Sequence, residues 1–303
     1  MENGKGKAVI QGFIAILIWS SSFIFVDMGL TYFTPEAIGG FRYFLGFVFI
    51  IPFIMFGKSP KVRLSKKQLL KLSLIGIIGY PIANLALFHG VRLLSAVTTS
   101  FMMASIPVLS FFASLFKIDK HPSKIQILGA LISMVGSYLY FAPTFTDINM
   151  TGFLIALLGI VSFTVFTMLT RKELSDNVMD TNVITAVPMA VGGGILLLVA
   201  FMQREPMVFT WQSVAIILVL AAINTAAGYM LYNASLKILT TYELNSMLNL
   251  SPLGTVFLSH YVLKESVSLM QFVGILILII GVYLVQKTIV QKFGVKLLAK
   301  IRR

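Results

Sequence analysis

Residues 123–140 read SKIQILGALISMVGSYLY, and residues 268–285 read SLMQFVGILILIIGVYLV. When the chain is compared with itself at this one offset, the serine, glutamine, glycine and tyrosine positions of the two stretches coincide. The same offset aligns residues upstream, namely Arg92 with Lys237, Met102 with Met247 and Pro107 with Pro252. Apolar helices share leucines by composition alone, whereas matched Pro, Gln, Gly and Tyr residues at a constant offset indicate an internal duplication.

The composition places this duplicated chain in a membrane. Of its 303 residues, 57% are hydrophobic and 12% are charged, and the mean hydropathy is +0.91. A soluble domain of this size needs a large polar surface and cannot hide so many apolar side chains. The chain contains no cysteine, which excludes disulfide bonds and thiolate chemistry.

The apolar runs predict about ten membrane-spanning helices, because a bilayer core takes about 20 helical residues to cross. The predicted spans are residues 8–30, 35–56, 68–91, 95–116, 124–142, 150–170, 181–202, 211–236, 241–262 and 267–287. They form a first repeat at 8–142 and a second at 150–287, followed by a basic tail at 288–303. Each repeat has an odd number of spans, so the second begins on the opposite side of the membrane. We therefore expect an all-α integral membrane protein, with ten transmembrane helices arranged as two inverted five-helix repeats around a central cavity.

The positive charges predict how the chain lies in the membrane. Lys and Arg together number 24, and the formal net charge is +13. Most of these residues fall at the termini and in loops assigned to the N-terminal side, and the opposite side is assigned Arg42, Arg92, Arg204 and Lys237. Cytoplasmic loops are enriched in Lys and Arg, so we expect a cell (plasma) membrane protein with both termini in the cytoplasm. This distribution indicates a lipid partner and no nucleic acid. The basic tail could lie on the inner leaflet as an amphipathic helix or be disordered.

Several short motifs match a known family in their order and spacing. The first two are Trp19-Ser20-Ser21-Ser22-Phe23 and, after Pro35, Phe41-Arg42-Tyr43. The next are Val91-Arg92-Leu93-Leu94-Ser95-Ala96 before Pro107, Leu236-Lys237-Ile238-Leu239-Thr240-Thr241 before Pro252, and Lys264-Glu265 before the last span. Together they make residues 8–286 resemble the EamA type of the drug/metabolite transporter superfamily.

The resemblance implies a bundle whose cavity is lined by the first, third, fourth, sixth, eighth and ninth spans, with the fifth and tenth at the periphery. It also implies transport, often export, of amino acids or related metabolites. Three positions depart from the family's pattern. Ser20 stands where the family has a glycine, and Asp119-Lys120 stands where an acidic residue is expected. In the second half, Ser162-Phe163 stands near where the family often has a tryptophan. These departures bear on substrate and helix packing more than on fold.

Neutral polar and aromatic side chains within the spans are the candidate substrate ligands. They are Trp19, Ser22, Tyr80, Asn84, Asn224, Tyr229, Asn245 and Asn249. Buried amides and hydroxyls in a membrane must find partners, which places them on the protein interior. Any one of them could tie two helices together, but as a set they favour a shared cavity.

Three ionisable residues are candidates for coupling or charge recognition, because charges within spans are costly. Arg42 could bind a substrate carboxylate, pair with Asp27, or extend to the outer headgroups. His89 could couple transport to protons, or simply be hydrogen-bonded. Glu243 could take up a proton or attract a cationic substrate. Alternatively, Glu243 could lie at the outer surface or pair with Lys237.

Small residues and prolines in the spans predict packing features. A stripe of Gly129, Ser133 and Gly136, echoed by Gly274 and Gly281, is typical of a close helix-packing seam and permits a homodimer. Pro107 and Pro252 occupy equivalent repeat positions, where they could act as paired hinges or as static kinks.

The leading functional hypothesis is a secondary-active transporter, an exporter or an exchanger, that moves a small molecule by alternating access. The chain has no P-loop motif for ATP hydrolysis, and we expect no cofactor, no metal site and no catalytic residues. A membrane-embedded enzyme would need convergent acids or histidines at one depth. A non-transporting sensor or assembly protein would need no alternating cavity.

Overall fold

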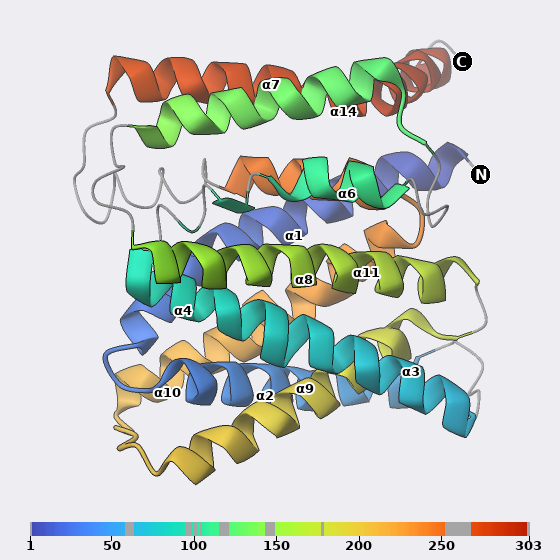
Figure 1. Cartoon of the computed structure of the whole chain (residues 1–303). Helices are drawn as coiled ribbons and strands as arrows, with labels where there is room; N and C mark the ends of the chain where they lie inside the picture. The colour runs from blue at the N-terminus through green and yellow to red at the C-terminus, as the bar shows by residue number, and fades with distance from the viewer. Residues whose placement is uncertain are drawn as a thin grey trace.

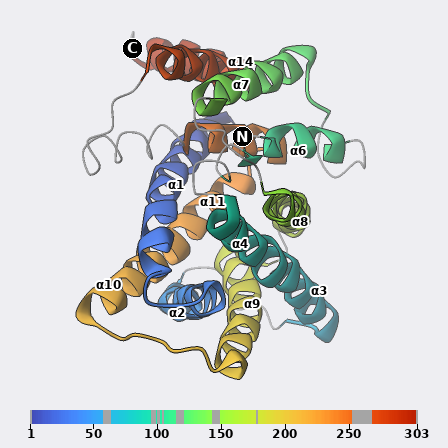
Figure 2. The same cartoon turned by 60° about the vertical axis from the view of Figure 1, so that its left-hand side comes forward.

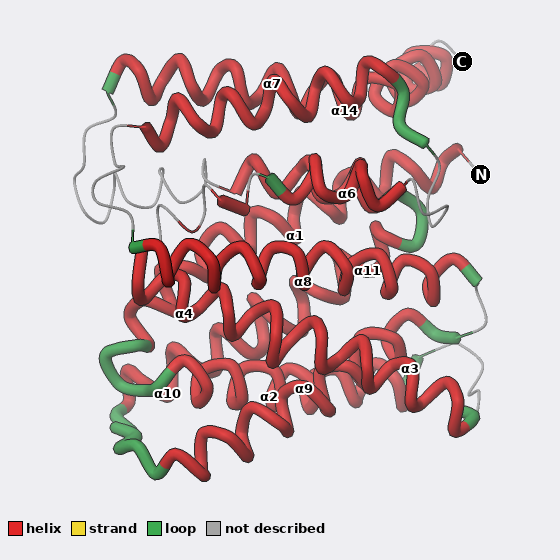
Figure 3. The backbone as a smooth tube through the Cα atoms, in the orientation of Figure 1, coloured by secondary structure: helices red, strands yellow, loops and turns green. Residues whose placement is uncertain are grey.

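The computed structural model describes residues 2–57, 64–94, 99, 102–103, 105–114, 121–142, 149–176, 179–251 and 268–301. Within these ranges every regular element is a helix (Figure 3). In chain order these elements are α1 (Glu2–Gly29), α2 (Pro35–Met55), α3 (Lys66–Ile77), η1 (Ile78–Asn84), α4 (Leu85–Leu94), α6 (Ile106–Ser114), α7 (Lys124–Phe141), α8 (Met150–Ser175), α9 (Thr181–Gln203), α10 (Trp211–Val219), η3 (Leu220–Ala227), α11 (Gly228–Leu236), α12 (Thr241–Ser246), η4 (Met247–Leu250) and α14 (Leu269–Ile301).

Among the described residues, 7 helices are long and apolar enough to cross a membrane. They are Gly4–Gly29, Pro35–Met55, Lys66–Leu94, Met150–Ser175, Thr181–Gln203, Trp211–Leu236 and Leu269–Gln286. A shorter apolar helix, Lys124–Tyr140, falls just below that length. The predicted spans at 95–116 and 241–262 run into residues outside the described ranges, so the number ten stays a prediction.

The helices pair in a reciprocal pattern between the two halves of the chain (Figures 1 and 2). Helix α2 packs against α9, α7 against α14, and α6 against α12, each with the counterpart in the other repeat. Helix α1 packs against α11 and η3, and in the same way α8 packs against α4 and η1. Two inverted repeats related by an axis in the membrane plane are expected to pair in this way.

The serine and glutamine shared by the two repeat stretches begin equivalent helices. The Ser123 N–H donates to Gln126 Oε1 at 2.8 Å, and the Gln126 N–H donates back to Ser123 Oγ. Ser268 and Gln271 form the same pair of bonds before α14, at 2.8 Å and 3.3 Å. These capping boxes satisfy donors that a helix start leaves free, which gives the matched residues a physical reason.

The glycines of the two stretches bring α7 and α14 into close contact. A Cβ atom on Gly129 would lie 2.7 Å from the Gly281 carbonyl oxygen, and one on Gly281 would lie 2.6 Å from the Gly129 carbonyl oxygen. The predicted seam of small residues is therefore confirmed. Because it joins two helices of the same chain, this seam is not a free surface for a second copy, and a homodimer stays a prediction that would need another face.

Two long helices carry a π-helical segment at related positions. In the helix Lys66–Leu94 it is η1, and in the helix Trp211–Leu236 it is η3. Pro81 lies inside η1, where the missing N–H and the ring disturb a regular hydrogen-bond ladder. Wide turns of this kind are frequent at functional sites, and both segments bury polar side chains, Asn84 in η1 and Asn224 and Thr225 in η3.

The end of α11 lies beside the start of α1. The Ser235 hydroxyl donates to the Ala8 carbonyl at 2.7 Å, and a Cβ on Gly4 would lie 3.5 Å from Ile238 Cδ1. Lys237 and Glu243 are therefore at the N-terminal end of the bundle, which corrects their expected place at the opposite surface. The predicted order of spans itself requires this, because the eighth connection is even-numbered and returns to the side of the N-terminus.

Candidate functional site

A cavity lies between the two halves of the chain and has about 60 Å³ of space for the centres of water molecules. Its lining residues are Trp19, Ser22, Val26, Arg42, Asn84, Leu87, Phe88, Met103, Phe163 and Tyr229. They come from α1, α2, η1, α4 and Met103 in the first repeat and from α8 and α11 in the second. The cavity therefore depends on both repeats for its walls.

Arg42 is the charged residue of this lining, and its side chain is held on two sides. Its Nε donates to Thr225 Oγ1 at 2.9 Å, and its Nη1 donates to Ser22 Oγ at 2.9 Å. The guanidinium carbon lies 5.1 Å from the Tyr43 ring centre and 5.9 Å from that of Phe88. These contacts connect α2 to α1 and η3, and they fix the direction of the positive charge.

Arg42 is only 4% exposed, and none of the described carboxylates forms an ion pair with it. The ion pairs within the described ranges join Lys71 to Glu173 and His89 to Glu36. The predicted pair with Asp27 is therefore wrong, because Asp27 lies on an exposed face of α1. The structure leaves Arg42 as a buried cation whose hydrogen-bond partners are neutral.

Trp19 forms one wall of the cavity and is fixed by a bond across the repeats. Its Nε1 donates to the Asn224 carbonyl oxygen at 2.8 Å. Its ring centre lies 4.8 Å from those of both Tyr229 and Tyr232. Gly228 makes room for the indole, since a Cβ there would lie 2.6 Å from Trp19 Nε1.

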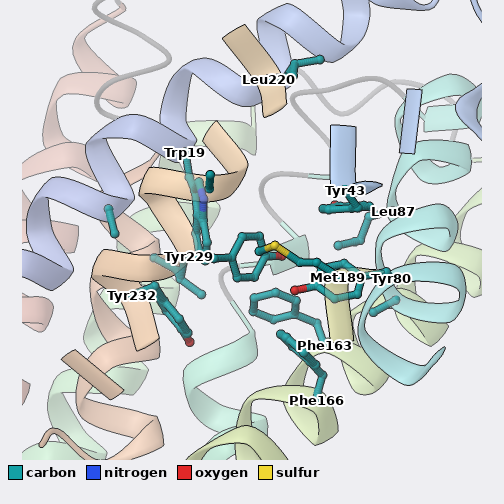
Figure 4. Packing of buried hydrophobic residues seen from close by; sticks show 14 of the residues in the cluster. Trp19, Tyr43, Tyr80, Leu87, Phe163, Phe166, Met189, Leu220, Tyr229 and Tyr232 are labelled. Atoms are coloured by element: carbon teal, nitrogen blue, oxygen red, sulfur yellow. The ribbon is translucent and has the colours of Figure 1, made fainter. Parts of the chain in front are cut away.

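Aromatic rings close the cavity on its inner side. The Tyr80 ring centre lies 4.4 Å from that of Tyr43, 5.7 Å from that of Tyr229 and 5.5 Å from that of Phe166. Figure 4 shows these rings with Trp19 and Phe163 in a single cluster. Tyr80 is 1% exposed, so it lies behind the cavity wall and supports Tyr229 there.

The predicted asparagines divide into one cavity residue and several helix ties. Asn84 lines the cavity. Asn224 Nδ2 donates to the Ile18 carbonyl oxygen and to Ser21 Oγ, which ties η3 to α1. Asn249 Nδ2 donates to Ser133 Oγ at 2.8 Å and ties η4 to α7.

Asn245 is the centre of a larger tie on the N-terminal side of the cavity. It accepts a hydrogen bond from the Tyr232 hydroxyl. Its Nδ2 donates to Ser110 Oγ at 2.8 Å and to Thr167 Oγ1 at 3.3 Å. Four helices, α6, α8, α11 and α12, therefore meet at this one amide, away from the cavity lining.

The remaining candidates lie outside the cavity lining. His89 Nε2 lies 3.0 Å from Glu36 Oε1 and joins the end of α4 to the start of α2. Glu36 was not among the predicted residues, although an acid directly after Pro35 at the start of an apolar run was a visible signal. Glu243 is buried, and its Oε2 accepts from the Thr240 N–H at 2.9 Å in a capping box.

Pro107 lies in the first turn of α6, where proline costs no helical hydrogen bond. Its partner in the hinge hypothesis, Pro252, lies outside the described residues, so the paired hinge stays a prediction. Within the described ranges, no three of the His, Asp and Glu residues gather into a group that could hold a metal ion.

These helices and this cavity define a class, a multi-pass helical membrane protein assembled from two similar halves. The family model of the EamA-like transporter family matches the chain twice, over residues 6–142 and 150–286. The chain therefore belongs to the EamA-like transporter family, and the resemblance seen in its motifs is confirmed. Membership of a transporter family favours transport over catalysis.

Two relatives share most of this chain's length. An uncharacterized transporter of Archaeoglobus fulgidus is 24% identical over 277 residues, which cover 89% of this chain and 94% of the relative. The uncharacterized transporter YyaM of Bacillus subtilis is 22% identical over 262 residues, with coverage of 83% and 84%. A solved crystal structure covers 94% of the chain with a TM-score of 0.79 at 16% identity. That structure shares the fold.

Proposed function

We propose that the protein is a secondary-active transporter, an exporter or exchanger, that moves amino acids or related small metabolites by alternating access. The observation that carries this proposal is the cavity whose walls come from both halves of the chain. A site between inverted repeats can be exposed to either side when the repeats exchange conformations. Family membership supports transport as the general activity.

The contacts on either side of the cavity support an alternating mechanism. On the N-terminal side, Tyr232 and Asn245 join helices of both repeats. On the other side, Glu36 of α2 contacts His89 of α4 in the first repeat and Gln203 of α9 in the second. We propose that these two sets of contacts open in turn, so that the repeats at 8–142 and 150–287 expose Trp19 and Tyr229 to one face and then to the other.

Counterflow into proteoliposomes tests the proposed function. Purified protein is reconstituted with amino acids, amines or nucleosides inside, and uptake of the labelled compound is followed. We expect saturable uptake of at least one amino acid or related metabolite. Trp19→Ala should reduce this uptake roughly tenfold or more, because a tenfold change corresponds to about 1.4 kcal/mol and the indole makes several buried contacts. The absence of saturable uptake across the whole panel would overturn the proposal.

The matched control is Trp211→Ala. The chain has 2 tryptophans, and Trp211 is 82% exposed at the start of α10 and does not line the cavity. Uptake by this variant should equal that of the wild type. An equal loss in both variants would show that the indole of Trp19 has no special place in transport.

Cysteine labelling separates a transporter from a non-transporting sensor. The chain has no native cysteine, so Ser22→Cys places a single thiol in the cavity. Alternating access predicts that membrane-impermeant reagents reach this thiol from both faces. Labelling from neither face, or from one face under every condition, would refute alternating access and favour the sensor.

A further inference from the structure

We infer that Arg42 binds the carboxylate of the transported molecule, so that the substrates are small carboxylic acids, with or without an amino group. This inference rests on the proposed function and names the substrate class of the same cavity. It follows from three features of Arg42: its free donors, its uncompensated charge and the apolar surface around it.

The donors of Arg42 are only partly used. A guanidinium has five N–H groups in a planar fork. Nε donates to Thr225 Oγ1, and one hydrogen of Nη1 is directed to Ser22 Oγ. The second hydrogen of Nη1 and both hydrogens of Nη2 have no partner among the described residues. One hydrogen from each of these nitrogens makes the parallel pair that two carboxylate oxygens match.

No carboxylate of the described residues forms an ion pair with Arg42 to compensate its charge. A buried cation is costly unless an anion offsets its charge. The described residues that line the cavity include no Asp or Glu, and the two ion pairs of the described ranges involve other cations. A bound anion therefore supplies the missing partner, whereas a bound amine would add a second positive charge.

The rest of the cavity sets the size and character of the molecule. Its volume admits roughly four to six water molecules at about 10–15 Å³ each, which corresponds to an acid with a short chain. Trp19, Phe163 and Leu87 offer apolar surface for that chain. Asn84 and Tyr229 add neutral polar groups, which could receive an amino group. The carboxylate is the feature that an acid and an amino acid share.

A binding assay can use Trp19 as its reporter. Replacing Trp211 with phenylalanine leaves Trp19 as the single tryptophan of the full-length, detergent-solubilised protein. Butyrate, butyramide and 2-aminobutyrate have chains of equal length but differ in charge. We expect butyrate, 2-aminobutyrate or both to change Trp19 fluorescence saturably. Butyramide should bind roughly tenfold or more weakly, because it lacks the charge-assisted bonds to Arg42. The two acid arms distinguish simple acids from amino acids.

Substitutions in the same single-tryptophan background test the residue itself. Arg42→Gln should weaken acid binding roughly tenfold or more, and Arg42→Lys should lie between Arg42→Gln and the unchanged residue, because lysine keeps the charge without the fork. Arg92→Gln is the matched control, since Arg92 is an exposed arginine near the end of α4 and does not line the cavity. It should bind the acids as before.

The outcomes separate this inference from the proposed function. If butyramide bound as tightly as the better-binding of the two acids, the inference would be overturned without any mutation, even if Arg42→Gln did not fold. Unchanged acid binding in folded Arg42→Gln would overturn it as well. Saturable transport of amines or nucleosides, with no binding of acids, would refute the carboxylate site while transport stood. Acid binding that depends on Arg42, without any transport, would refute the proposed function and leave the site in place.

Discussion

Gly228 shows how a missing side chain shapes the cavity wall. It is the first residue of α11, directly after η3. The Trp19 indole lies where a Cβ on residue 228 would be. The indole can therefore reach the Asn224 carbonyl oxygen from α1. Any larger residue at position 228 would push Trp19 away from this acceptor and from the Tyr229 ring.

Gly228→Ala should lower the thermal stability of the detergent-solubilised protein. An overpacked interior position costs about 1–3 kcal/mol, and Trp19 fluorescence should shift because the Nε1 bond is lost. Gly194→Ala is the control, since a Cβ there meets nothing within 4 Å. It should be neutral or stabilising by up to about 1 kcal/mol, because alanine is the better helix former. Equal melting temperatures in the two variants would contradict this role of Gly228.

At the residue scale, the sequence predicts which side chains are interior better than it predicts their partners. Polar residues within apolar helices identified Trp19, Asn84 and Tyr229, because lipid has no partners to offer them. The partners of Arg42 could not be read in the same way. Thr225 lies in the other repeat, and its approach depends on how α2 packs against η3. A nearby acid in the sequence, Asp27, was a plausible but incorrect partner.

At the scale of elements, Asn245 is the point where α6, α8, α11 and α12 are joined. The Asn245 amide is fully buried and makes three side-chain hydrogen bonds, one as acceptor and two as donor. Breaking such a junction leaves the Tyr232 hydroxyl, Ser110 and Thr167 without their common partner. If the N-terminal side of the cavity opens during transport, this junction has to separate.

Asn245→Ala should weaken the contacts on the N-terminal side of the cavity. Leaving buried donors and acceptors unpaired costs about 1–3 kcal/mol, so the melting temperature should fall. A thiol introduced by Ser22→Cys should also react faster with reagent added from the N-terminal side. Asn182→Ala, at a half-buried position near the start of α9, should change neither measurement. A lower stability with unchanged labelling would assign Asn245 to packing alone.

Helix positions were predictable from the sequence, whereas their local geometry was less so. Runs of apolar residues located the helices of the described ranges, since about 20 such residues match the bilayer core. The π-helical segments η1 and η3 were not foreseen, because a wide turn changes hydrogen bonding without changing hydropathy. Pro81 and the polar pair Asn224-Thr225 within apolar runs were the available signals. The capping boxes that begin α7 and α14 also have a signal in the sequence, since each is a Ser-x-x-Gln motif.

At the scale of the whole molecule, the two repeats fix which ends lie together. The N-terminus, the C-terminus and the end of α11 share one end of the bundle (Figure 1). The loop before α2 and the residues before α10 lie at the other end. The chain fold thus separates two surfaces, and the charge distribution predicts that the surface with the termini is cytoplasmic.

Single-cysteine labelling in intact cells can measure this sidedness. Lys5→Cys and Lys237→Cys should both be protected from an impermeant reagent until the membrane is opened. Thr31→Cys and Glu205→Cys should react at once, because these residues are exposed at the opposite end of the bundle. Labelling of Lys237→Cys together with Thr31→Cys would contradict the arrangement described for α11 and α1.

The charge of Arg42 also affects the step in which the transporter, after it releases a substrate, reorients its cavity to the starting side of the membrane. Moving one elementary charge through the membrane potential involves about 2.3 kcal/mol per 100 mV. With a monoanion bound, the cavity is neutral and this term vanishes. A buried charge without a counter-ion is also costly, so on the proposed mechanism the empty form reorients more slowly than the loaded form. Butyrate on the far side of proteoliposomes should then accelerate the exit of labelled butyrate several-fold. Net efflux should respond to an imposed voltage, and one-for-one exchange should not.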